Sequence, residues 1–106
     1  MPKYMFQANY VGEGIKGLLK EGGSSRRAVV ESLFKSLGGT VESFYYALGD
    51  TDLYVIAELP DDATAAAGAL TVAATGTVTL KTIALLTPEQ LDAAAKKTPH
   101  YRAPGK

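Results

Sequence analysis

The sequence predicts an α+β domain with a four-stranded antiparallel sheet, two helices on one face of that sheet and a short C-terminal helix. Two observations lead to this fold class. Apolar residues alternate with a period of two in the strand-like runs and follow a helical pattern or composition elsewhere. The runs follow one another as strand, helix, strand, strand, helix, strand. This is the order of the ferredoxin-like βαββαβ motif and not that of a doubly wound sheet.

The first part of the chain is expected to form one strand and one long helix. Aromatic and small residues alternate with a mixed set over residues 4–11, which is typical of a strand. A helical turn is expected at residues 15–20. The pair Gly22-Gly23 breaks it, so that Ser24 or Ser25 becomes the N-cap of the next helix. That helix is indicated by apolar residues at positions i, i+3, i+4 and i+7: Val30, Leu33, Phe34 and Leu37.

A β-hairpin is expected next, because two runs rich in β-branched and aromatic residues flank a short polar loop. The runs are residues 40–48 and 53–59. The loop begins at Gly49 and contains two aspartates. We expect Asp50 and Asp52 to form the turn by accepting hydrogen bonds from their own backbone amides.

The last part of the chain predicts a helix, a strand and a short helix. Acidic residues at 61–62 favour a helix N-terminus, and the alanine-rich segment that follows runs to residue 75. Residues 77–86 read as the fourth strand. A threonine N-cap, a proline at the first helical position and a capping-box glutamine then begin a helix that runs to about residue 97: Thr87, Pro88 and Gln90.

The chain of 106 residues is long enough for one hydrophobic core. We therefore predict a single domain over residues 1–106, with its core at about 4–86 and a C-terminal helix and tail at 87–106. Basic and acidic residues are equal in number and interspersed, which argues against nucleic acid as a partner. The chain has no cysteine, no signal-peptide pattern and no long apolar run, so we expect a cytoplasmic protein without a membrane partner.

Metal, cofactor and nucleophile chemistry have little support in the sequence. His100 is the only histidine and, with no cysteine present, a metal site would have to rely on it and on carboxylates. It lies in a proline-containing tail that we expect to be exposed. We predict no cofactor and no metal. Arg26 and Arg27 begin a helix, where cations are unfavourable, and this placement hints at an anion or an acidic partner nearby.

The spacing Gly12-x-Gly14-x-x-Gly17 matches the dinucleotide-binding fingerprint, but its context does not. The acidic residue that binds the ribose would have to lie about 20 residues later, which falls inside a predicted helix. A tight strand-to-helix turn that needs positive φ explains the glycines better. A third interpretation places a small anion against the backbone amides beside Lys16.

The chain resembles the GYD-domain family of small prokaryotic proteins. The resemblance rests on Tyr4, on "GIK" at 14–16, on "LGGTVESFYYALGDTDLYVIAELPDD" at 37–62 and on "GTVTLKT" at 76–82, and it covers about residues 4–86. It implies a ferredoxin-like fold, association through open sheet faces into α/β-barrel dimers, and no settled biochemical activity. The naming turn is represented by Gly49, Asp50 and Asp52, with Thr51 where the family has tyrosine.

One sheet face is expected to remain uncovered by helices, and its polar residues are our candidate site. Alternation places a mixed set on that face, as ligand-binding or interface residues: Gln7, Asn9, Tyr54, Glu58 and Lys81. Glu58 and Lys81 would form a cross-strand or intersubunit ion pair. Alternatively, Glu58 is a general base in an oligomeric barrel, with Tyr54 and Lys81 binding a small aromatic or oxygenated substrate.

Two functional hypotheses follow. The first is a homo-oligomer that assembles through this sheet face and binds a small molecule between the sheet and the helices. The second is a cofactor-independent enzyme of the dimeric α/β-barrel type, an isomerase or monooxygenase, with Glu58 as its base.

Overall fold

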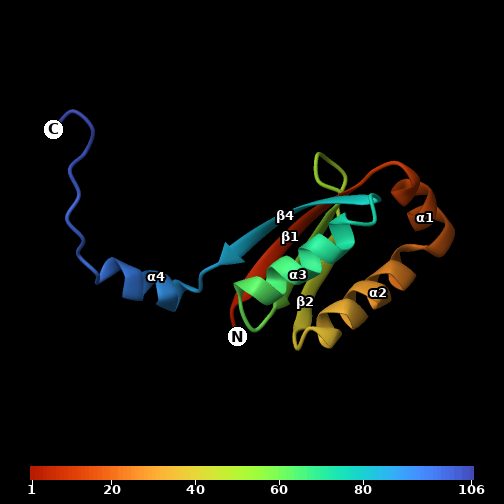
Figure 1. The fold of residues 1–106 in the computed structure, drawn as a ribbon, viewed down its shortest axis with the longest axis horizontal. Coiled ribbons are helices and arrows are strands. Elements are labelled where there is room, and N and C mark those ends of the chain that lie inside the picture. The colour runs from red at the N-terminus through yellow and green to blue at the C-terminus, as the bar shows by residue number, and fades with distance from the viewer.

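A computed structural model describes all 106 residues. Its sheet has four antiparallel strands in the order β2-β3-β1-β4, which confirms the predicted ferredoxin-like topology. The first strand therefore lies in the interior of the sheet, and the second and fourth form its edges (Figure 1). The strands are β1 (Lys3–Tyr10), β2 (Thr40–Tyr46), β3 (Leu53–Glu58) and β4 (Val78–Leu85).

Four helices accompany the sheet: α1 (Glu13–Glu21), α2 (Gly23–Ser36), α3 (Asp62–Ala73) and α4 (Pro88–Ala95). The predicted turn at 15–20 is thus a longer helix, and the prediction of a serine N-cap for the next helix is wrong. Gly22, with φ of 84°, ends α1 and caps α2, so Ser24 and Ser25 lie inside the first turn of α2. A glycine at positive φ allows this sharp change of direction without a side-chain cap.

The core lies between the sheet and the two long helices. Its buried residues come from alternate positions of β1 and β3 and from the faces of α2 and α3 that look toward the sheet. Phe6 and Phe34 pack with ring centroids 5.0 Å apart, which joins the central strand to α2. On the helix-covered face of the sheet Phe6, Ala8, Val55 and Ala57 are buried, and Val78 and Leu80 pack against the core.

The strand-to-helix turn after β1 explains two of the three glycines in the fingerprint spacing. Gly12 has φ of 52°, as the turn interpretation expected. Gly14 is buried, and a Cβ atom there would collide with the backbone carbonyl of Thr77. A Cβ on Gly17 would meet nothing, and Gly17 has no positive φ. The glycines therefore serve chain direction and close packing at the end of the sheet.

The loop between β2 and β3 is fixed to the end of β1 by a reciprocal pair of side chains. The Asn9 Oδ1 atom accepts a hydrogen bond from the Asp52 backbone amide at 2.8 Å. Asp52 Oδ2 in turn accepts one from the Tyr10 amide at 3.0 Å. The prediction that Asp52 bonds an amide of its own turn is therefore wrong, because the neighbouring strand offers a free amide within reach. Asp50 is exposed and forms no hydrogen bond.

The C-terminal segment leaves the domain after β4. In Figure 1 the helix α4 and the tail extend away from the sheet. The molecule measures 56 × 33 × 23 Å, and its radius of gyration is 16.9 Å. A compact domain of this length has a radius of about 13 Å. Residues 86–106, which we call the C-terminal arm, account for the elongated shape.

Candidate functional site

The open face of the sheet carries the side chains that the sequence placed there. In the register of β1 with its neighbours, Gln7 lies between Tyr54 and Lys81, and Met5 lies between Ile56 and Ile83. A register shift between Val41 and Ser43 marks a bulge in β2, after which Tyr45 lies opposite Tyr54. The face therefore has an apolar and aromatic centre with polar ends.

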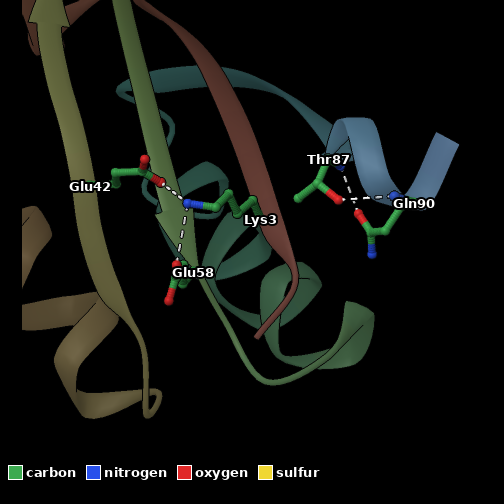
Figure 2. A network of polar contacts seen from close by, with 5 residues as sticks. All are labelled: Lys3, Glu42, Glu58, Thr87 and Gln90. Atoms are coloured by element: carbon green, nitrogen blue, oxygen red, sulfur yellow. Dashed lines mark hydrogen bonds and ion pairs between the residues drawn. The ribbon is translucent and has the colours of Figure 1, made fainter. Parts of the chain in front are cut away.

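At one end of this face, one ammonium group is shared by two carboxylates. Lys3 Nζ lies 2.6 Å from Glu42 Oε2 and 3.3 Å from Glu58 Oε1 (Figure 2). The hydrogen bond to Glu42 is the main cause that raises the pKa of Lys3 above its ordinary value, and the hydrogen bond to Glu58 adds to it. Since one positive charge faces two negative ones, this group of three side chains keeps a net negative charge.

The predicted ion pair between Glu58 and Lys81 does not form within the chain. Glu58 lies opposite Lys3, whereas Lys81 lies opposite Gln7, so the two residues are separated by β1 and by several positions along the strands. Lys81 is exposed and makes no ion pair. Strand order decides this outcome, because β1 lies between β3 and β4 and itself supplies the cation.

Part of the open face is aromatic or apolar surface in contact with solvent. Tyr45 is 71% exposed, Tyr54 37% and Ile83 40%. Met5 and Ile56 lie between them and are half-buried by these neighbours. Contiguous apolar surface of this kind is uncommon on monomers and often marks a contact surface.

A second feature lies on the other side of the sheet, between the sheet and the helices α2 and α3. It is a cavity of about 80 Å³ whose wall is almost entirely apolar. Phe34 and Leu37 approach Gly68 closely, so the helices touch at that level. The cavity is lined by β1, β3 and β4 on one side and by α2 and α3 on the other. The two helices contribute Val29, Val30, Leu33, Ala69 and Val72 to its wall.

The polar residues at this cavity are Tyr10 and Arg26. They also line a neighbouring hollow of about 220 Å³ at the end of the sheet, together with Glu13, Glu21 and Thr77. Arg26 is paired with Glu21 at 3.5 Å. The apolar chamber and the polar hollow are therefore adjacent, with Tyr10 and Arg26 in the wall of both.

Tyr46 adds a hydroxyl group close to Tyr10. Its Oη donates a hydrogen bond of 3.0 Å to the Gly23 carbonyl at the start of α2. Partial burial is the main cause that raises the pKa of Tyr46 to about 12, and the neighbouring Tyr10 adds to it. Arg26 and Arg27 act in the opposite direction. The hydroxyl thus stays protonated at neutral pH as a hydrogen-bonding group.

The sequence-predicted site residues fall into separate places. Gln7, Tyr54, Glu58 and Lys81 share the open face, whereas Asn9 is engaged in holding the β2–β3 loop. Lys16 is exposed on α1, forms an ion pair of 3.4 Å with Glu13 and does not line the polar hollow. Gly49 lies in the exposed part of the loop.

Sequence reasoning did not select Tyr10, Arg26 or Tyr46 as one group. The only signal was the unusual position of two arginines at a helix start. Tyr10 and Tyr46 belong to strands that are distant in sequence, and only the folded sheet brings their hydroxyl groups toward the start of α2.

The structure contains no group of three or more His, Cys, Asp or Glu side chains placed to hold a metal ion. None of its helices has both the length and the apolar character that crossing a bilayer requires.

Comparison with known proteins completes the description of the chain. Searches of curated proteins and of solved structures found no match. The family model of the GYD domain matches residues 4–95. The match extends past the predicted limit of residue 86 and includes α4, so this helix is part of the family's domain. The chain belongs to the GYD domain family.

Proposed function

We propose that this protein is a homo-oligomer that binds a small, largely apolar molecule between its sheet and its helices. The observation that supports binding most directly is the apolar cavity, in which 13 of the 15 lining residues are hydrophobic. Ligand sites are typically concave and apolar, with a few polar groups that fix orientation. Tyr10 and Arg26 supply such groups at the boundary with the polar hollow.

The dimensions of the two compartments indicate the shape of the ligand. The apolar chamber of about 80 Å³ is smaller than the cavity of roughly 150 Å³ that takes up benzene in an engineered protein. It suits a short aliphatic chain. The adjoining hollow of about 220 Å³ has carboxylate, guanidinium and hydroxyl groups in its wall, which suit a polar head. The ligand class is therefore a small amphipathic molecule.

A matched pair of substitutions on α3 tests this binding site. Ala69 lines the cavity, whereas Ala67 is exposed on the same helix. We expect Ala69→Leu to fill the chamber and abolish binding of 1-butanol, the probe, while Ala67→Leu keeps it. The measurement is a butanol titration followed by the amide NMR signals of Phe34, Val72 and Val78. Butanol binding that survives Ala69→Leu unchanged, or that is absent in the unmodified protein, contradicts the proposed site.

The homo-oligomeric part of the proposal is supported by the open sheet face. Domains of two layers cover one face of the sheet with helices and leave the other to solvent or to a partner. Here the centre of that face is formed by Met5, Tyr54, Ile56 and Ile83. A second copy placed against it would remove these side chains from water, and burial of apolar area favours association.

Ile56 provides a test of the sheet-face dimer, and Thr79 on the same face provides its control. Thr79 is exposed near the start of β4, away from the apolar centre. Ile56→Asp is expected to weaken self-association by roughly 100-fold, the effect of losing a contact of hot-spot size. Thr79→Asp should change it little. Mass measured by light scattering over a concentration series gives the result, and equal association by both variants would refute packing through this face.

No observation favours the enzymatic alternative over ligand binding. Glu58 lies on the face opposite the cavity and is engaged by Lys3. Its role as a general base stays a prediction from the sequence.

A further inference from the structure

The C-terminal arm has the features of a segment that is folded but unpartnered. Every residue from Pro88 to Lys106 is exposed. Three large apolar side chains of the arm face solvent: Leu86 is 65% exposed, Leu91 60% and Tyr101 81%. A helix of eight residues is marginal on its own in water, and most helical stability in proteins comes from packing of an apolar side. The arm therefore lacks the contact that would stabilise it.

The start of the arm is nevertheless well defined. Thr87 and Gln90 form a complete capping box, in which Gln90 Oε1 accepts from the Thr87 amide at 2.8 Å and Thr87 Oγ1 accepts from the Gln90 amide at 3.1 Å (Figure 2). Leu86 is the only residue between the end of β4 and this N-cap. So short a connection leaves little freedom to turn α4 back, and the helix points away from its own sheet (Figure 1).

The arm and the rest of the molecule carry opposite net charges. Residues 86–106 contain four basic and two acidic residues, a net charge of +2. Residues 1–85 contain seven basic and nine acidic residues, a net charge of −2. The arm of one copy is thus electrostatically complementary to the body of another.

We propose that the C-terminal arm docks on a second copy of this chain, with Lys96 and Lys97 against the partner's Glu42 and Glu58. These carboxylates share a single ammonium group and retain a net negative charge. They lie at the end of the sheet from which the arm departs, because Lys3 is opposite both Glu58 and Leu85. The eight residues of α4 carry the two lysines roughly 12 Å beyond that end, out of reach of their own carboxylates.

This inference rests on the proposed homo-oligomer and adds the exchange of arms to it. Leu91 and Tyr101 would be covered by the partner in the same contact. The two-fold symmetry of a homodimer would make the exchange reciprocal, so that each copy holds the arm of the other.

Zero-length cross-linking of mixed-isotope protein tests the exchange on the full chain. Chains labelled with ¹⁴N and ¹⁵N are mixed, allowed to exchange subunits, and treated with a carbodiimide that joins lysine to carboxylate only at ion-pair distance. We expect Lys96 or Lys97 joined to Glu42 or Glu58 in peptides of mixed isotope, which only a link between chains produces. The variant Lys96→Glu with Lys97→Glu removes the reactive amines as well as the positive charge, so its readout is self-association, which should weaken about 10-fold by light scattering. Lys16→Glu with Lys20→Glu, both exposed on α1, should leave self-association and the links unchanged.

The outcomes separate this inference from the sheet-face dimer. A dimer by light scattering whose arm links are absent or confined to one chain overturns the exchange and leaves the sheet-face contact standing. Mixed-isotope links that persist in an associating Ile56→Asp variant support the exchange and overturn the sheet-face contact. A chain that is monomeric at all concentrations overturns both.

Discussion

At the scale of single residues, the three glycines of the Gly12-x-Gly14-x-x-Gly17 spacing have three different environments. Gly12 has positive φ, Gly14 touches the backbone of Thr77, and Gly17 has neither constraint. The spacing alone does not distinguish them, since a close approach between residues far apart in sequence is created only by the fold. The dinucleotide interpretation fails for the same reason, because it depends on the context of the motif and not on the motif itself.

Gly14 and Gly17 therefore make a matched pair for stability measurements. Gly14→Ala should lower the free energy of unfolding by about 2 kcal/mol, because its methyl group has no space beside the Thr77 carbonyl. Gly17→Ala should raise it by about 0.5 kcal/mol, because alanine restricts the unfolded chain in a helix with open surroundings. Denaturant unfolding of both variants gives the comparison. Similar values for the two would contradict the assigned difference in packing.

Asp52 and Asp50 make a second pair, in the loop between β2 and β3. Asp52→Ala leaves the part-buried Tyr10 amide without its acceptor and should cost about 1 to 2 kcal/mol. Asp50→Ala removes an exposed side chain without hydrogen bonds and should change stability by less than about 0.5 kcal/mol. Thermal unfolding of the two variants decides the point. The expectation fails if Asp50→Ala is the more damaging substitution.

At the scale of elements, two tyrosine hydroxyls attach helix starts to the sheet. Tyr4 Oη, on β1, donates a hydrogen bond of 2.6 Å to Asp62 at the start of α3. Tyr46 Oη, on β2, donates to Gly23 at the start of α2. The hydrogen bond to Asp62 is the main cause that raises the pKa of Tyr4 to about 12, and burial adds to it.

These attachments predict a loss of stability at alkaline pH. Unfolded tyrosine loses its proton near pH 10, whereas Tyr4 and Tyr46 keep theirs to about pH 12 in the folded protein. The stabilising contribution is complete below pH 10 and is lost as the pH rises through 12. Tyr4→Phe should therefore make the free energy of unfolding less dependent on pH between 10 and 12. Tyr101→Phe, whose hydroxyl forms no hydrogen bond within the chain, serves as control. An unchanged pH slope in Tyr4→Phe would argue against this role.

Most elements follow from the sequence because their signals are local. Alternation located β1, β-branched and aromatic composition located β3, and the capping box of α4 was correctly identified from Thr87, Pro88 and Gln90. The start of α2 was placed too late, since one glycine at positive φ replaced the expected serine cap.

The candidate site was predicted less well than the elements, because its contacts depend on strand order. Alternation correctly assigned Gln7, Tyr54, Glu58 and Lys81 to one face. It did not show that Lys3, and not Lys81, lies beside Glu58. Nor did it show that Asn9, in β1, accepts a hydrogen bond from the β2–β3 loop, or that Asp52, in that loop, accepts one from β1.

At the scale of the whole molecule, the domain has two surfaces whose roles differ. The helix-covered side contains the apolar cavity and the adjacent polar hollow. The open side contains the exposed side chains of Tyr45, Tyr54 and Ile83 and, at one end, Lys3 with Glu42 and Glu58. If a ligand and a second copy both bind, they contact opposite sides of the same sheet. Binding on one side then influences the other only through the sheet itself, and β1 contributes residues to both.

The central place of β1 also has a consequence for biosynthesis. Lys3 pairs across the sheet with Glu58 and with Leu85, so the first strand to leave the ribosome finds its second partner only when nearly the whole chain has been made. The β2–β3 hairpin can form early, but β1 lacks its partner on the other side until β4 has been synthesised. Such long-range closure slows folding and prolongs the exposure of unpaired strand edges. Synthesis of β4, and not formation of the earlier hairpin, is therefore the event that permits the sheet to close.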